Sequence, residues 1–166
     1  MDIIEIYHAG TEIIRHPEIK FSRPDLDFGP GFYLTNIFEQ AENWGLKRAE
    51  KRQNKGIINK YLLRQKDLFN TEGINIKIFD TYSEEWLDFI TDNRSSGRKW
   101  EQWDYIEGGV ADDRIIDTID LYIAGFLDKE TALKRLIYLK PNNQICINKQ
   151  EILDDFLEFN GYLELD

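Results

Sequence analysis

Residues 27–35 of this 166-residue chain are DFGPGFYLT, a turn-forming segment that leads into a short β-rich run. The Gly-Pro-Gly at 29–31 favours a tight turn, because glycine tolerates backbone conformations that other residues avoid and proline fixes one torsion angle. The aromatic and branched residues that follow favour a strand. A bare backbone corner beside two aromatic rings also suits stacking on a flat heteroaromatic ligand. The segment therefore serves the fold alone, or it also places Phe32 and Tyr33 against a ligand.

Short strands and helices alternate on both sides of this segment. Alternation of apolar residues and β-rich composition predict strands at residues 3–8, 31–35, 57–64, 74–79, 103–110 and 144–147, with 156–163 as a candidate last strand. Apolar residues at helical spacing predict helices at 37–53, 83–90, 112–125 and 128–137. Residues 15–30 hold three prolines and predict a loop. The elements do not form regular strand–helix–strand units, so the pattern predicts an α+β fold with six or seven strands and flanking helices.

Length and composition indicate one domain over residues 1–166, with 42% hydrophobic residues available for a core. The 21 basic and 31 acidic residues give a net charge of −10, which argues against non-specific coating of nucleic acid. This net charge does not exclude a local basic patch. The dense basic run at 47–55 is interpreted as a solvated helix face, with contact to nucleic acid or an acidic protein as the alternative.

Several classes of protein are not expected. A single cysteine, Cys146, allows neither an intrachain disulfide nor a thiolate zinc cluster, and no metal is expected. The N-terminal residues lack the basic and apolar regions of a signal peptide, and no apolar run approaches the roughly 20 residues of a membrane span. We therefore expect a cytoplasmic protein without a membrane partner. The glycine motifs of Rossmann and P-loop nucleotide sites are also absent, so a nucleotide would bind in another way.

Three local patterns carry candidate chemistry: residues 7–11 (YHAGT), the segment 22–35, and residues 142–146 (NNQIC). Taken singly, His8 can be a hydrogen-bonded structural histidine, Tyr33 a core residue and Gln144 a solvated one. Taken together, a histidine followed by small residues leaves room for a ligand at the backbone, and a late polar residue can close the site from another strand.

These residues carry a resemblance to known proteins. The chain resembles the ADP-ribosyltransferase superfamily, in its diphtheria-toxin-like branch, whose site contains His, Tyr and usually Glu on three strands. It resembles more closely a family of small bacterial proteins catalogued as domain of unknown function 3990. The residues that resemble this family are 27–35, Gln40-Ala41, Trp44, 85–90, Asn93-Arg94, 104–106, 108–113 and 144–146. The resemblance implies an ADP-ribosyltransferase-like split β-sheet core and NAD as co-substrate.

The resemblance also implies a role for individual residues. His8 corresponds to the histidine that bonds the adenine-side ribose, and Ala9 to a glycine whose backbone pairs with the nicotinamide carboxamide. Tyr33 corresponds to the tyrosine that stacks on nicotinamide, and Gln144 stands where the catalytic glutamate usually lies. The implied catalytic set is therefore His8, Tyr33 and Gln144, and the implied NAD-binding set is His8, Ala9, Gly10, Arg23, Asp27, Gly31, Phe32 and Tyr33.

Glutamine at position 144 changes the expected chemistry. Cleavage of the bond between ribose and nicotinamide builds positive charge on the ribose carbon, which a carboxylate stabilises. Glutamine holds a hydroxyl by hydrogen bonds but carries no charge and is no base. Asp112 and Asp113 are candidate auxiliary carboxylates, although acids at a helix start also simply complement the helix dipole. Asp27 is alternatively a turn former, and Arg23 either meets the NAD diphosphate or is solvated.

We therefore expect an NAD-dependent ADP-ribosyltransferase that modifies an intracellular macromolecule, either protein or nucleic acid. By resemblance it would be a bacterial toxin or defence effector held silent by an antitoxin-like partner. Three alternatives stay open: an NAD- or ADP-ribose-binding module without turnover, an NAD glycohydrolase, and a protein-interaction domain.

Overall fold

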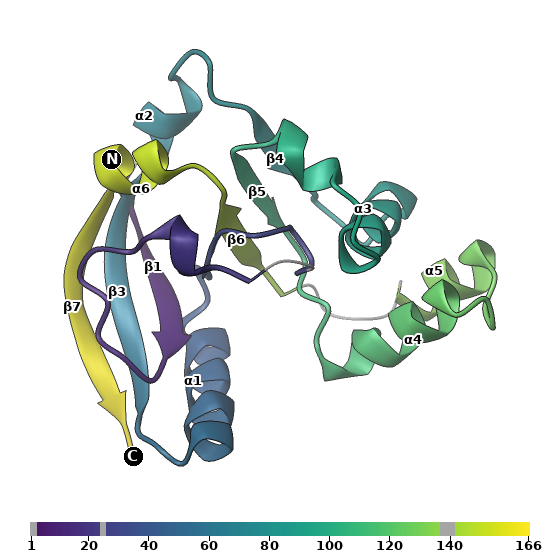
Figure 1. The fold of residues 1–166 in the computed structure, drawn as a ribbon, viewed down its shortest axis with the longest axis horizontal. Coiled ribbons are helices and arrows are strands. Elements are labelled where there is room, and N and C mark those ends of the chain that lie inside the picture. Colours follow the sequence, from purple (N-terminus) through teal and green to yellow (C-terminus); the bar gives the residue numbers. More distant parts are fainter. Residues whose placement is uncertain (1–2, 24–25, 137–141) are drawn as a thin grey trace.

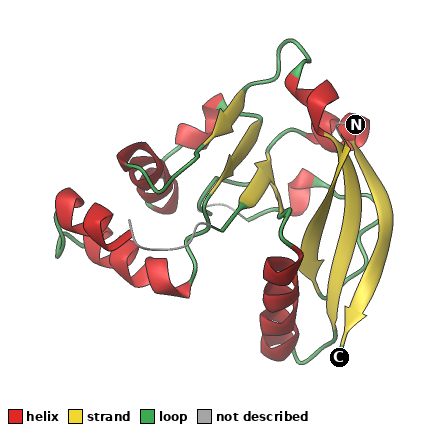
Figure 2. Cartoon of the chain, turned by 180° about the vertical axis from the view of Figure 1, so that it is seen from behind, coloured by secondary structure: helices red, strands yellow, loops and turns green. Residues whose placement is uncertain are grey.

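The computed structural model describes residues 3–23, 26–136 and 142–166, and these contain two β-sheets that face each other (Figures 1 and 2). The first sheet is antiparallel, with β3 (Gly56–Arg64) between β1 (Ile3–Gly10) and β7 (Leu157–Leu165). The second has the order β2 (Phe32–Leu34), β6 (Gln144–Ile147), β5 (Tyr105–Gly108) and β4 (Ile76–Ile78). Only the β4–β5 pair in it is parallel. A single bridge between Tyr7 and Thr35 joins the two sheets where β1 passes the end of β2.

In the described ranges, six α-helices flank the sheets: α1 (Phe38–Arg52), α2 (Gln65–Phe69), α3 (Glu84–Arg94), α4 (Asp113–Ile123), α5 (Lys129–Leu136) and α6 (Gln150–Phe156). Two short 3₁₀ turns lie at Ile19–Phe21 and Lys99–Gln102. Ser83 caps α3, because its Oγ accepts a hydrogen bond from the Trp86 backbone at 3.2 Å. Helices α3, α4 and α5 lie on the side of the second sheet that faces away from the first sheet (Figure 1).

The core is divided by the second sheet, because successive residues of a strand point to opposite faces. The layer between the two sheets combines residues of both, namely Ile6, Tyr61, Leu63, Phe32, Leu34, Tyr105, Ile145 and Ile147. The opposite layer packs the second sheet against α3 to α5, with Ile106, Cys146, Trp86, Leu87, Phe89, Ile90, Ile115 and Ile119 among its buried members. A third, small cluster packs α1 against Ala9 and Ile58 of the first sheet.

The α+β class and the seven strands expected from the sequence are confirmed. The prediction of four helices was too low, because the short helices α2 and α6 each adjoin a strand directly. The strand expected at 103–110 covers only Tyr105–Gly108: Trp103 and Asp104 follow a 3₁₀ turn that ends at Gln102 and do not join the sheet ladder. Ile137, expected in the helix of α5, lies outside the described residues. Across the described ranges, no helix is long and apolar enough to cross a membrane.

Candidate functional site

His8 lies near the end of β1 with its imidazole fixed on both sides. Its Nδ1 lies 2.7 Å from the carbonyl oxygen of Tyr33, and its ring stacks on Phe32 with 4.4 Å between centroids. Burial, helped by the positive charge of Arg48, lowers the pKa of His8 to about 4. The imidazole is therefore neutral at pH 7. Because a carbonyl can only accept, the single proton belongs on Nδ1, which leaves Nε2 as a hydrogen-bond acceptor.

Ala9 and Gly10 follow at the edge where β1 separates from β2. Tyr7 exchanges both backbone hydrogen bonds with Thr35, at 2.8 and 2.9 Å. Ala9 comes two residues later, so its N–H and C=O point to the same side, past the bridge. The Ala9 carbonyl accepts a hydrogen bond from Nη1 of Arg48. A side chain on Gly10 would place its Cβ 3.7 Å from Nε2 of His8, in van der Waals contact with this nitrogen, and glycine avoids that contact.

Tyr33 belongs to β2 and pairs with Cys146 of β6. Its hydroxyl donates to the Gly29 carbonyl at 2.6 Å and accepts from the Phe28 backbone N–H at 3.0 Å. Burial raises the pKa of Tyr33 well above its ordinary value. The phenol is thus held by the turn that precedes its own strand, and its ring packs in the layer that faces α3 to α5.

Gly31 is required for this arrangement. A Cβ built at Gly31 would lie 2.5 Å from Oδ1 of Asn148, 2.6 Å from Sγ of Cys146 and 2.7 Å from the carbonyl of Ile147. Real Cβ atoms do not approach other atoms so closely, and one of the three is backbone. The glycine therefore allows the turn to lie directly on β6.

Gln144 is the first residue of β6 and is buried. Its Nε2 donates to the carbonyl of Gly109 at 3.4 Å, which leaves the amide oxygen as the atom able to accept a hydroxyl proton. The candidate residues His8, Tyr33 and Gln144 thus lie on three neighbouring strands. His8 and Tyr33 touch, but only through the Tyr33 main chain: the imidazole lies against Phe32, and the phenol lies on the opposite face of β2.

A polar network fixes the residue before Gln144. The Asn143 carbonyl accepts hydrogen bonds from Oγ1 of Thr35 at 2.8 Å and from Nε2 of Gln40 at 2.7 Å. The Asn143 side chain donates to Oε1 of Glu107 at 2.9 Å. Glu107 is a carboxylate that the sequence patterns did not single out, and it adjoins the candidate site from β5. Its place in a predicted strand gave no signal of this role.

Of the two expected auxiliary carboxylates, Asp112 and Asp113, the structure describes the side chain of Asp112. Oδ2 of Asp112 accepts a hydrogen bond from Nδ2 of Asn142 at 2.9 Å, two residues before Gln144. The Asp112 carbonyl also accepts the N–H groups of Ile115 and Ile116, so this residue begins the hydrogen bonding of α4. The side chain of Asp113 lies outside what the structure describes.

Asp27 and Arg23, which precede the Tyr33 strand, have different surroundings. Asp27 forms an ion pair with Nε of Arg94 at 2.5 Å, and its carbonyl accepts from Asn93 at 2.9 Å, so it anchors the loop to α3. Arg23 is exposed. Burial lowers the pKa of Arg48, and the positive charges of Arg52 and Arg23 lower it further. A role for either residue at NAD stays a prediction.

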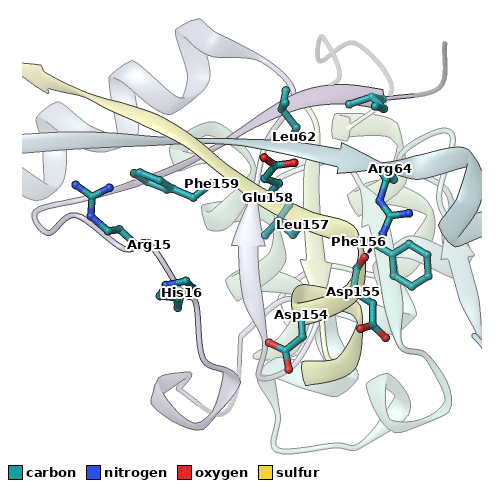
Figure 3. Close-up of a pocket in the computed structure, with 11 residues that line it drawn as sticks. Arg15, His16, Leu62, Arg64, Asp154, Asp155, Phe156, Leu157, Glu158 and Phe159 are labelled. Carbon is teal, nitrogen blue, oxygen red and sulfur yellow. Dashed lines mark hydrogen bonds between the residues drawn. The ribbon is translucent and has the colours of Figure 1, made fainter.

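Two cavities lie in different parts of the molecule. The larger, about 550 Å³, is at the opposite end of the first sheet from His8 and is lined by residues including Arg15, Arg64 and Phe159 (Figure 3). Its arginines lie over aromatic rings, Arg15 over Phe159 and Arg64 over Phe156, and Arg64 also pairs with Asp67. These charges are therefore engaged within the protein.

The smaller cavity, about 270 Å³, adjoins the start of β6. Its lining includes Gly109, which accepts a hydrogen bond from Gln144, and Asn143, which precedes Gln144 and donates to Glu107. His8, Tyr33 and Gln144 are not among its lining residues. Among the residues whose side chains are described, no group of three His, Cys, Asp or Glu residues is arranged to hold a metal. The candidate site thus offers neutral hydrogen-bonding groups and nearby carboxylates.

This arrangement of two small sheets with flanking helices defines an α+β protein whose candidate residues lie on strands near the place where the two sheets meet. A family model described as "Protein of unknown function (DUF3990)" matches residues 4–159, so the chain belongs to this family. A comparison with curated proteins and one with solved structures each found no match.

Proposed function

We propose that this protein binds NAD and transfers its ADP-ribose group to an intracellular macromolecule. The observation that carries the proposal is the state of His8. It is neutral, it is fixed by the Tyr33 carbonyl, and its Nε2 is an acceptor beside a glycine. A neutral acceptor fixed in this way suits a ribose hydroxyl, which donates one proton. The resemblance of the His, Tyr and Gln positions to the diphtheria-toxin-like ADP-ribosyltransferases supports the same ligand.

The neighbouring backbone fits the rest of such a ligand. The N–H and C=O of Ala9 point past the Tyr7–Thr35 bridge, as a pairing with a carboxamide requires. Its carbonyl accepts one hydrogen bond from Arg48, and the second lone pair of this oxygen can accept from a carboxamide. The Tyr33 ring would need to turn from its packing against the helices to stack on nicotinamide.

The reaction breaks the bond between the nicotinamide nitrogen and the ribose carbon, and its electron pair leaves with nicotinamide. An acceptor nucleophile forms the new bond to that carbon and loses its proton. Gln144 would hold a ribose hydroxyl through its amide oxygen. Glu107 and Asp112 are carboxylates linked to the same strand end through Asn143 and Asn142, and either would stabilise positive charge on a ribose bound beside it.

A second function is favoured by Gln144 itself. An uncharged amide in place of the usual glutamate suits a module that binds NAD or ADP-ribose without turnover. Hydrolysis with water as acceptor would need the same pocket. If the protein is a transferase, we propose that it acts as a cytoplasmic bacterial toxin or defence effector. Its acceptor would be a protein or a nucleic acid, and an antitoxin-like partner would silence it.

The test is to incubate the purified protein with labelled NAD and cell lysate, and to follow both nicotinamide release and label on macromolecules. His8→Asn should abolish label transfer, while His16→Asn, at the exposed loop histidine, should leave it unchanged. Release without labelled macromolecules would assign hydrolysis. Stabilisation by NAD without release would assign the binding module, and a ligand at about 100 times its Kd should add roughly 2.7 kcal/mol. If the protein neither releases nicotinamide nor is stabilised by NAD, the proposal that it binds NAD is refuted.

Gln144→Glu separates the transferase from the binding module. In a transferase limited by the missing charge, the new carboxylate should raise nicotinamide release by about a hundredfold. A fall in an existing activity would show that the amide is needed for the reaction. A variant that remains without turnover while still binding NAD would favour the binding module.

A further inference from the structure

One face of α1 runs along β1 and places side chains at regular intervals beside the candidate site. Gln40, Trp44, Arg48 and Arg52 are each four residues apart, so they share this face of the helix. Gln40 bonds the Asn143 backbone, and Trp44 packs beside Ala9. Arg48 donates to the Ala9 carbonyl, and Nη1 of Arg52 donates to Oγ1 of Thr11 at 3.1 Å. The helix therefore spans from the start of β6 to the residues that follow β1.

Two of these side chains join a third to form a cluster of positive charge. Arg23, Arg48 and Arg52 all have exposed side chains. The pKa of Arg48 is lowered first by the partial burial of its guanidinium, and then by the charges of Arg52 and Arg23, which lie close enough to repel it. Within the described part of the chain, no carboxylate forms an ion pair with any of the three. Such a cluster is unusual in a protein with ten more acids than bases, because nearby acids would normally neutralise it.

The cluster lies next to His8 and Ala9. Arg48 contacts the residue after His8, and its charge also contributes to the lowered pKa of that histidine. A guanidinium carries five N–H donors in a fixed plane, so the bond to Ala9 leaves others for a ligand. Arginine donors of this kind match the oxygen atoms of phosphate groups.

We propose that Arg23, Arg48 and Arg52 form the binding site for the diphosphate of a dinucleotide, an inference that rests on the proposed function. A bound diphosphate would remove the mutual repulsion of the three arginines while His8 holds a ribose. A compact diphosphate suits the three arginines better than a nucleic-acid strand does, because the overall charge of −10 repels an extended polyanion.

The experiment measures, by calorimetry, the affinity of the full chain for ADP-ribose, inorganic pyrophosphate and nicotinamide riboside. Nicotinamide riboside lacks the diphosphate and serves as the comparison ligand. Arg48→Gln and Arg52→Gln should each weaken ADP-ribose and pyrophosphate binding by roughly ten- to a hundredfold, as expected for a charge-assisted hydrogen bond. Nicotinamide riboside should bind all variants equally. Lys51→Gln, at an exposed position between the two arginines on α1, is the matched control and should bind like the unmodified protein.

The outcomes separate this inference from the proposed function. NAD turnover with unchanged ADP-ribose affinity in both arginine variants would overturn the diphosphate site and leave the function standing. Arginine-dependent binding of pyrophosphate without any NAD turnover would support the site and count against the function. An equal loss in Lys51→Gln would overturn the site, since it would reflect general charge alone. The site would also be overturned if the arginine variants lost affinity for a single-stranded oligonucleotide but kept their affinity for ADP-ribose and pyrophosphate. Because Arg52 is exposed and donates a hydrogen bond to the side chain of Thr11, its variant remains informative even if Arg48→Gln disturbs folding.

Discussion

His8 should make the stability of this protein depend on pH in a way that one substitution removes. The folded state holds the pKa of His8 near 4, whereas an unfolded histidine titrates near 6.5. The folded state therefore disfavours the protonated imidazole. The resulting stability is fully present above pH 6.5 and is lost as the pH falls through 6.5 towards 4.

The size of the effect follows from these two values. At pH 5, nearly all unfolded chains carry the proton, but only about one folded chain in ten does, which corresponds to a loss of about 2 kcal/mol relative to pH 8. Below pH 4 the loss approaches roughly 3 kcal/mol. His8→Asn keeps a side-chain N–H donor for the Tyr33 carbonyl but cannot take up the proton, so this part of the pH dependence should disappear.

The assay is urea unfolding followed by tryptophan fluorescence at pH 8 and pH 5. The original protein, His8→Asn and His16→Asn are compared, so the titration of all other groups cancels in the differences. The free energy of unfolding of the original protein and of His16→Asn should fall by about 2 kcal/mol more than that of His8→Asn. Equal falls in all three proteins would show that His8 is not held neutral, and the assignment of Nε2 as an acceptor would fail with it.

Three further predictions concern residues around the site. Gly31→Ala should destabilise the protein by about 2 kcal/mol in urea unfolding, because its Cβ would meet three atoms within 2.7 Å, whereas Gly10→Ala, whose nearest contact is 3.7 Å, should cost little. Asp27→Asn should cost about 3 kcal/mol, since its ion pair is mostly buried at 14% and 18% side-chain exposure. Lys134→Gln, at a pair exposed by 73% and 78%, should cost less than 1 kcal/mol. Cys146 should react slowly with an alkylating reagent in the native state, because burial raises the pKa of its thiol.

Each of these predictions has a clear contrary result. Equal stability of the two glycine variants would show that the turn can move away from β6. Equal losses at the buried and the exposed ion pair would remove the anchoring role of Asp27. Rapid labelling of the cysteine in native protein, at the rate seen after unfolding, would show that the layer between the second sheet and the helices opens readily.

The short helices show why part of the fold could not be predicted from local sequence. α2 begins at Gln65 directly after β3, and α6 ends at Phe156 directly before β7. α2 has five residues and α6 has seven, so each makes about two turns or fewer. Over so few residues, the spacing of apolar side chains does not distinguish a helix from the adjoining strand. Both are stabilised by tertiary packing, through Leu68 in α2 and through Ile152 and Leu153 in α6.

The candidate site shows the same limit for function. His8, Tyr33 and Gln144 were proposed as site residues from local patterns and a family resemblance, and their roles stay predictions. The register of β5 and β6 places Glu107 opposite Ile145, and the Asn143 side chain links Glu107 to the residue before Gln144, which no local pattern reveals. The arginines of α1 were interpreted as a solvated face, because helical spacing does not show what the helix packs against.

The sequence by itself determined the α+β class, most strands and helices, and the turn before Tyr33, because alternation, helical spacing and Gly-Pro-Gly act over a few residues. Only the tertiary structure decided which side chains meet. The neutral state of His8 depends on a carbonyl 25 residues away and on a charge from α1, and such contacts arise only when the two sheets and the helix are packed together.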